Sequence, residues 1–248
     1  MIKKDLARAL EIKNPKKEDI FGIVGRMEVL LECLKSDSRH KGLIPFLQTY
    51  YLITKAVAEK KLKHPRFFKQ PDKLDALDVH FASLYFHPLK LFLEKGQAVK
   101  PWQTYFSYCQ QPNGAPFLQM LLGINAHINA DLTSSLIALG YDQKEDYLAI
   151  NKILHEQIPA IMKFLALTEH DWIGLGALFM KKFTEQEFRK IIVGWRLRAW
   201  ENAQDRRNNR HIILQTEKIG QELIKTFDNL SHLKHLNHIT QQVNSLRV

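Results

Sequence analysis

The chain has 248 residues, of which 45% are hydrophobic and 25% charged, and its formal net charge is +10. This composition excludes a disordered chain, because the apolar surface is large enough to offset the entropy lost on folding. The 11 glycines and 9 prolines also exclude collagen-like or low-complexity material. The length allows one large domain or two small ones.

Helical periodicity dominates the chain, and alternating strand patterns are scarce. In chain order, the predicted helices cover residues 19–35, 44–63, 72–95, a segment beginning at Pro101, 117–139, about 146–166, 170–182, 185–205 and 209–245. Pro88 is expected to kink or break the third helix, and Gly140 to end the buried helix 117–139. We therefore predict an all-α protein, a single compact domain over residues 1–248 with about eight or nine helices. Helix 209–245 is expected to pack on the helices that precede it.

Cys33 and Cys109 are the only cysteines, which excludes a disulfide scaffold and a zinc site made of cysteine alone. Cys33 lies in an apolar helical pattern, so we interpret both as reduced thiols. No apolar segment follows the basic start of the chain, and no window approaches 18 consecutive apolar residues. Neither a signal peptide nor a transmembrane helix is expected, and the predicted location is the cytoplasm. A protein exported by a non-classical route would show the same pattern.

The excess of positive charge lies at both ends of the chain. Residues 1–70 carry 16 basic and 8 acidic side chains, residues 71–170 carry 7 and 10, and residues 171–248 carry 13 and 8. A basic excess can bind nucleic acid or an anionic surface. No nucleic-acid-binding motif accompanies these residues, however. Phosphate-binding glycine loops, Gly-x-Ser-x-Gly and His-Glu-x-x-His are also missing, which argues against kinases, ordinary α/β-hydrolases and zincins.

Polar side chains interrupt the apolar helix predicted over 117–139. His127 and Asp131 are four residues apart, and so are Asn125 and Asn129 on another strip of the helix. Side chains at this spacing meet on a helix surface, so each pair can touch. If the helix is buried, each polar group needs a partner or a water molecule. Gly123 would let another helix approach closely.

Three interpretations of the His127–Asp131 pair remain open from spacing alone. Both side chains can ligate a divalent metal from one helix face. Alternatively, Asp131 accepts a hydrogen bond from His127 and fixes its tautomer for work as a general base. In the third interpretation, His127, Asn129 and Asp131 form a buried network that only sets the register of the helix.

The run from Asn125 to Leu132, Asn-Ala-His-Ile-Asn-Ala-Asp-Leu, resembles the signature of an uncharacterised, mainly bacterial family with a domain of unknown function. Further segments are similar to that family in the same order: Arg26 to Glu28, Tyr51 to Thr54, Leu77 to Tyr85, Pro101-Trp102, Asp146-Tyr147 with Asn151, and Arg198 to Trp200. The resemblance covers about residues 20–205 and implies a helical fold but no reaction. Thr133 departs from the family pattern, which has proline after the Asp-Leu pair.

The Ala-His-x-x-x-Asp spacing of Ala126, His127 and Asp131 is also similar to a ligand helix of zinc-dependent phospholipase C and single-strand nuclease proteins. Those proteins are all-α as well, but their sites need several more histidines and an N-terminal tryptophan ligand. This chain begins with Met1-Ile2. The likeness is therefore an analogy from a short pattern.

The predicted site extends beyond the central helix. The candidate catalytic residues are His127, Asp131, Asp78 and Arg198. Asp78 stands among apolar neighbours, where an unpaired charge is costly, and Arg196 or Arg198 could pair with it or with Asp131. The candidate metal ligands are His127, Asp131 and Asp146, although Asp146 could equally cap the helix that it begins. The candidate binding residues are Asn125, Asn129, Asn151, Trp102 and Trp200.

Two functions follow as hypotheses. The first is an enzyme, a metal-assisted hydrolase of a small ester or phosphoester, with a divalent metal as cofactor and metal-bound hydroxide as nucleophile. The second is a non-enzymatic binding or interaction module, in which the polar network is structural and a basic surface binds an acidic partner. A related alternative is a pocket for a small acidic or lipid-like ligand, with Trp102, Trp195 and Trp200 as apolar walls.

Overall fold

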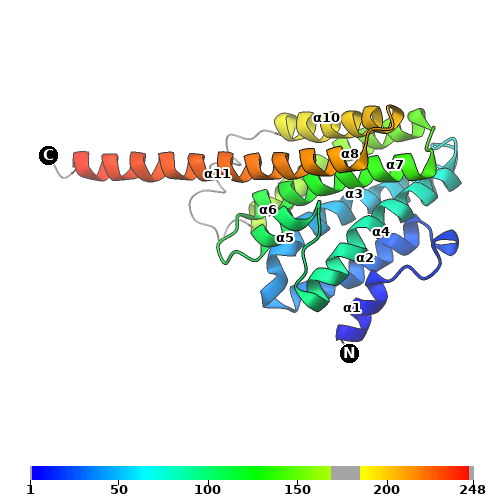
Figure 1. Ribbon diagram of the computed structural model, residues 1–248, viewed down its shortest axis with the longest axis horizontal. Coiled ribbons are helices and arrows are strands. Elements are labelled where there is room, and N and C mark those ends of the chain that lie inside the picture. Colours follow the sequence, from blue (N-terminus) through cyan, green and yellow to red (C-terminus); the bar gives the residue numbers. More distant parts are fainter. Residues whose placement is uncertain (1, 169–184, 246–248) are drawn as a thin grey trace.

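The computed structural model describes residues 2–168 and 185–245, and every regular element in those ranges is helical (Figure 1). The α-helices are α1 (Ile2–Leu10), α2 (Ile20–Lys35), α3 (Ile44–Lys63), α4 (Pro71–Lys95), α5 (Gln103–Cys109), α6 (Pro116–Asn125), α7 (Thr133–Leu139), α8 (Lys144–Thr168), α10 (Glu185–Gln204) and α11 (Asn209–Ser245). Two 3-10 helices, η1 (Pro15–Lys17) and η2 (Ser38–Leu43), and the π-helix η3 (Ala126–Leu132) complete them.

The predicted all-α bundle is confirmed, with nine helices in the described ranges when α6, η3 and α7 count as one continuous run. Residues 44–63 form a helix as predicted, and Gly140 ends α7 in the left-handed conformation, with φ +55°. The helix over 72–95 is not broken at Pro88, because Pro88 and Leu89 are buried and packing holds both halves together. The helix predicted over 170–182 lies outside the described residues.

The continuous run from α6 through η3 to α7 lies at the centre of the fold. Every residue from 114 to 133 is buried. The run contacts α3, α4, α10 and α11, and these surrounding helices explain why its sequence is apolar on nearly every side. The sequence predicted a regular α-helix here, but residues 126–132 adopt the wider π conformation. Such π segments are rare and frequently occur at functional sites.

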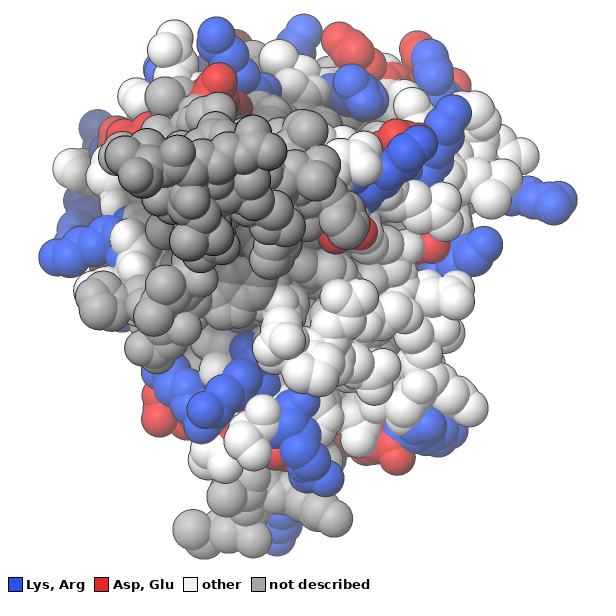
Figure 2. All heavy atoms as spheres, turned by 90° about the vertical axis from the view of Figure 1, so that its left-hand side faces the viewer, with Lys and Arg blue, Asp and Glu red and all other residues white. Residues whose placement is uncertain are grey.

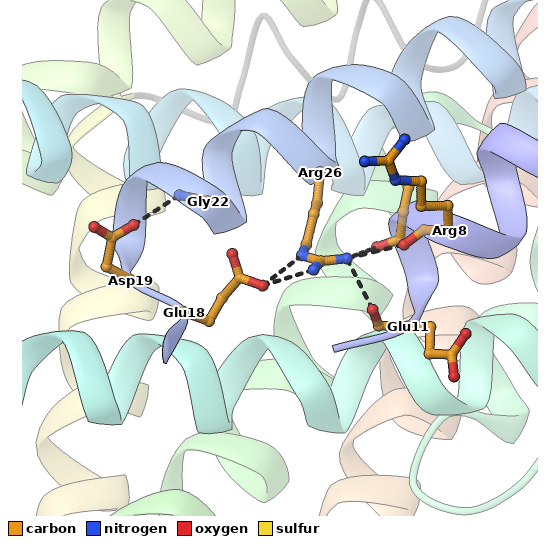
Figure 3. A network of polar contacts seen from close by, with 7 residues as sticks. Arg8, Glu11, Glu18, Asp19, Gly22 and Arg26 are labelled. Atoms are coloured by element: carbon orange, nitrogen blue, oxygen red, sulfur yellow. Dashed lines mark hydrogen bonds and ion pairs between the residues drawn. The ribbon is translucent and has the colours of Figure 1, made fainter. Parts of the chain in front are cut away.

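The α1 helix was not predicted, because it is short and carries four charged residues among nine. Arg26 of α2, the arginine of the Arg26 to Glu28 segment, holds α1 in place (Figure 3). Nη1 of Arg26 donates to the carbonyl oxygens of Arg8, in the last turn of α1, and of Glu11, just after it, at 2.9 Å each. Its Nε and Nη2 donate to Glu18 Oε2 at 3.0 and 2.6 Å. This arginine therefore satisfies carbonyls that a helix end leaves without partners.

The first part of α11 packs on the body of the protein, where α11 contacts α5, α6 and η3. Its second part extends past the other described helices (Figure 1). On the end of the molecule seen in Figure 2, Lys and Arg side chains of the described residues are spread out and interleaved with Asp and Glu. No helix in the described ranges combines the length and the apolar character that a membrane span requires.

Gly123 is required by the close approach of α3 to α6. A Cβ atom built on Gly123 would lie 2.3 Å from Cγ and 2.6 Å from Cβ of Phe46. The Phe46 ring is a hub of the core, with the rings of Tyr85 and Trp102 at 5.0 and 5.5 Å. Because Phe46 is buried among these rings, it has no room to move away.

Gly123→Ala is therefore predicted to destabilise the fold by about 1–3 kcal/mol through overpacking, measured by guanidinium unfolding. Gly194→Ala is the matched control, since Gly194 lies inside α10 and nothing lies within 4 Å of an added Cβ. The control should be neutral or stabilising by up to about 1 kcal/mol, because alanine favours helix. Equal stabilities of the two variants would contradict the proposed close approach.

Candidate functional site

The two polar pairs predicted on the central helix are both present. Nδ1 of His127 lies 3.0 Å from Oδ2 of Asp131, and Nδ2 of Asn129 donates to Oδ1 of Asn125 at 2.9 Å. All four residues are buried, with exposed fractions of 3–6%. The surroundings of the two pairs differ, however, and this difference separates a structural pair from a candidate site.

The asparagine pair is closed by the last helix. Nδ2 of Asn125 donates to the carbonyl oxygen of Thr216 in α11 at 2.9 Å, while its Oδ1 accepts from Asn129. A Cβ on Gly220 of α11 would lie 3.2 Å from Cγ2 of Thr104 in α5, a tight contact, so the glycine helps α11 lie close to α5. The predicted binding residues Asn125 and Asn129 therefore attach α11 to the centre of the fold.

The His127–Asp131 pair is completed by Trp102, the residue before α5. The indole Nε1 of Trp102 donates to the same Oδ2 of Asp131 at 3.1 Å. Indole can only donate, so Oδ2 acts as an acceptor. Nδ1–H of His127 then donates to Oδ2 as well, a tautomer inferred from the partners, and Nε2 carries the lone pair. Nε2 is buried and has no hydrogen-bond partner among the described residues.

Aromatic side chains from α3 and α4 enclose the imidazole. The ring of Phe81 stacks on His127 with 3.5 Å between centroids and 9° between planes, and the ring of Tyr50 lies at 4.4 Å. This burial lowers the pKa of His127 well below its usual value, so the imidazole is neutral at pH 7. Burial also raises the pKa of Asp131, and the hydrogen bond from Trp102 opposes that rise.

A cavity of about 80 Å³ lies beside the imidazole, between α3, α4, α8, α10 and the central helix. Three of its lining residues have a buried polar atom without a hydrogen-bond partner in the described structure: Nε2 of His127, the hydroxyl of Tyr50 and Oδ2 of Asp78. Buried polar atoms are nearly always paired, so three orphans in one cavity indicate bound water or a ligand.

Asp78, one of the predicted site residues, is among the residues that line the cavity. Part of the residue is exposed, but Oδ2 is buried. Burial, followed by the charges of Asp75 and Asp19, raises the pKa of Asp78 to about 8, while Lys61 opposes the rise. The Asp78 carboxyl is therefore mostly protonated at neutral pH.

Arg196 of α10 also lines the cavity and is 6% exposed. Its Nε donates to Oδ1 of Asn151 at 2.6 Å, and its Nη2 donates to the carbonyl oxygen of Tyr147 at 3.3 Å. The guanidinium also lies over the Tyr147 ring, 4.5 Å from the centroid. The predicted binding residue Asn151 thus positions a buried arginine.

Other predicted site residues lie elsewhere. Arg198 is exposed and does not line the cavity. Both carboxylate oxygens of Asp146 accept from backbone amides, those of Lys69 and Gln70, at 2.8 Å each. In the described ranges, no three His, Cys, Asp or Glu side chains lie together in a group that could hold a metal ion.

The tryptophans predicted as cavity walls have other neighbours. Trp102 lies behind Asp131, and Trp200 packs on Tyr147 with 4.9 Å between ring centroids. The walls of the cavity are mainly aliphatic, and its lining residues do not include Trp102, Trp195 or Trp200. Sequence reasoning missed Tyr50 and Phe81 and preferred Arg198 to Arg196. The helical spacing could have indicated the right arginine. Arg196 follows the apolar Ile192 by four residues and therefore shares its buried helix face, whereas Arg198 does not.

The chain belongs to the family of unknown function DUF5995, whose family model matches residues 20–234. The matched range begins at α2 and includes both polar pairs, the cavity and the first part of α11. No curated protein and no solved structure matches the chain. The resemblance seen in the sequence is thus confirmed at the level of the family.

The pKa of Asp78 predicts a pH-dependent stability. The unfolded chain releases this proton near pH 4 and the folded chain near pH 8, so folding stability falls between those values. The stability of wild type relative to Asp78→Asn should therefore fall from pH 5 to pH 8, by up to about 1.4 kcal/mol per pH unit, and level off above. Urea unfolding at several pH values measures it, with Asp72→Asn at an exposed carboxylate of the same helix as control. A pH-independent difference would contradict the raised pKa.

Proposed function

We propose that the protein is an enzyme in which the His127–Asp131 pair acts as a general base on a small molecule held in the cavity. The observation that carries this proposal is Nε2 of His127, which is buried, unpartnered among the described residues and on a residue that lines the cavity. A buried acceptor that the fold leaves open is costly unless something occupies it. Both residues of the pair belong to the π-helix η3, and π segments frequently occur at functional sites, which also supports the proposal.

Hydrolysis of a small ester suits this arrangement. Nε2 takes a proton from a water molecule as the water oxygen attacks the acyl carbon, and the proton is then returned to the departing alkoxide. Asp131 stabilises the imidazolium formed between these steps and keeps Nε2 as the atom that faces the substrate. Trp102 and Phe81 hold the carboxylate and the ring in place.

A metal-assisted form of this reaction needs further ligands near His127 and Asp131. Asp146, the third predicted ligand, is engaged by two backbone amides, and the described residues offer no group of three ligating side chains. The metal-free general base is therefore the form that the described geometry favours.

The alternative, a binding module with a structural polar network, draws support from the asparagine pair, which is closed against α11. On the face seen in Figure 2, basic side chains of the described residues are interspersed with acidic ones, so this face offers no purely basic patch to an acidic partner. Turnover that depends on His127 separates the two functions.

We predict that the protein hydrolyses p-nitrophenyl acetate or butyrate, and that His127→Ala lowers kcat/KM by about 10²–10⁴-fold, the usual contribution of a general base. Asp131→Asn should also lower it strongly, because an asparagine no longer fixes the tautomer in which Nε2 is free. His155→Ala, at an exposed histidine of α8, is the matched control and should match wild type. Circular dichroism checks that each variant is folded.

Chelator treatment and elemental analysis of tag-free protein separate the two forms of the enzyme. Unchanged turnover in chelator supports the metal-free base. If wild type contains about one equivalent of a transition metal, and His127→Ala loses both the metal and turnover, the metal-free base is refuted in favour of the metal-assisted hydrolase. No turnover of esters or of p-nitrophenyl phosphate by folded wild type would favour the binding module.

A further inference from the structure

We infer that Arg196 is the anion-recognising residue of the cavity, and that the class of molecule it recognises there is a short aliphatic carboxylate, the kind of acid that the proposed ester hydrolysis forms. This inference rests on the proposed function, because it requires the cavity to be a site for small molecules. It adds the chemical class of the ligand and the residue that selects it.

The first argument is the charge of Arg196, which the described structure leaves uncompensated. Arginine stays protonated in proteins, and a buried cation without a counter-ion is costly. The hydrogen bonds of Arg196 go to two neutral groups, the amide of Asn151 and the carbonyl of Tyr147. The groups that interact with its charge are Tyr147 and Tyr141, and no carboxylate of the described residues pairs with it. A ligand carboxylate would supply the missing counter-ion.

The second argument is the fixed orientation of the guanidinium. Asn151 and the Tyr147 carbonyl hold two of its nitrogens, and the Tyr147 ring lies against its plane. A guanidinium that is already oriented loses little entropy when it binds a carboxylate. Asn151 and Tyr147 are therefore positioning residues for this anion site.

The third argument is the shape and lining of the cavity. Its walls are formed largely by aliphatic side chains, among them Val57, Leu74, Leu77, Leu154 and Ile192. One water molecule needs about 10–15 Å³ of such space, so about 80 Å³ accommodates roughly five to eight waters or a ligand of that size. Half-buried lining residues, Ile53, Asp78, Phe81 and Ile150, mark the side where the cavity approaches the surface. A short aliphatic chain packs against such walls and places no polar group of the ligand against them.

The fourth argument favours a single negative charge on the ligand. At neutral pH, Arg196 is the one full charge among the lining residues, because His127 is neutral and Asp78 holds its proton. A carboxylate neutralises this charge, whereas a phosphate monoester would leave excess negative charge beside Asp78. Tyr50 and Asp78, which line the same cavity, each have a buried oxygen without a hydrogen-bond partner among the described residues.

The test is isothermal titration of the full-length protein with hexanoate, hexan-1-ol, hexylamine and butyl phosphate at pH 7. Wild type is expected to bind hexanoate at least tenfold more tightly than hexanol, because only the carboxylate forms an ion pair with the guanidinium. Arg196→Met should lose that preference while hexanol binding persists. Arg198→Met, at the exposed arginine two residues further along α10, is the matched control and should keep it.

Several outcomes would overturn the inference. These are equal affinities of wild type for hexanoate and hexanol, tighter binding of butyl phosphate, or an unchanged preference in Arg196→Met. If Arg196→Met does not fold, Arg196→Lys replaces it, and its affinity for hexanoate should fall because the planar fork is lost. His127→Ala separates this inference from the proposed function, since it should lose most of the turnover and still bind hexanoate. Hexanol binding without anion preference would leave the cavity as a site and refute the role of Arg196.

Discussion

The fold depends on burying an imidazole and a carboxylate inside an aromatic core. His127 and Asp131 are 3% and 5% exposed, and each would be costly to bury alone. They are tolerated because they bond to each other and Asp131 also accepts from Trp102. The rings of Phe46, Phe81 and Tyr50 then surround the imidazole, so the helices that carry them must meet at this point. Gly123 permits that meeting, since a side chain there would collide with Phe46.

The central helix uses the same four-residue spacing for two purposes. The asparagine pair finds its last partner in the backbone of α11 and so serves assembly of the fold. The histidine pair finds partners for Nδ1 and the carboxylate, while Nε2 remains available beside a cavity. The asparagine pair, which has found its partners, is therefore structural, whereas the histidine pair, which keeps Nε2 unpartnered, carries the proposed chemistry.

The cavity places the remaining unusual groups of the core around this open nitrogen. Asp78 comes from α4, Tyr50 from α3 and Arg196 from α10, so the site exists only when three helices have docked on the central one. Apart from these groups the walls are mainly aliphatic, which strengthens electrostatic interactions inside. A single buried arginine can therefore discriminate strongly between charged and neutral ligands, while the neutral imidazole is ready to accept a proton.

The helical class, most helix positions and the two pairs at spacing four follow from the sequence alone, because periodicity and i, i+4 geometry are local properties. Asp78 is also marked by the sequence, since a carboxylate between apolar neighbours in a helix is costly unless it has a partner. Tertiary structure decided the rest. Four features depend on which helix faces come together: the π conformation, the choice of Arg196 over Arg198, the hydrogen bonds of Asp146 to the backbone before α4, and the aromatic enclosure of His127. Those contacts join residues up to 77 positions apart, and no local pattern specifies them.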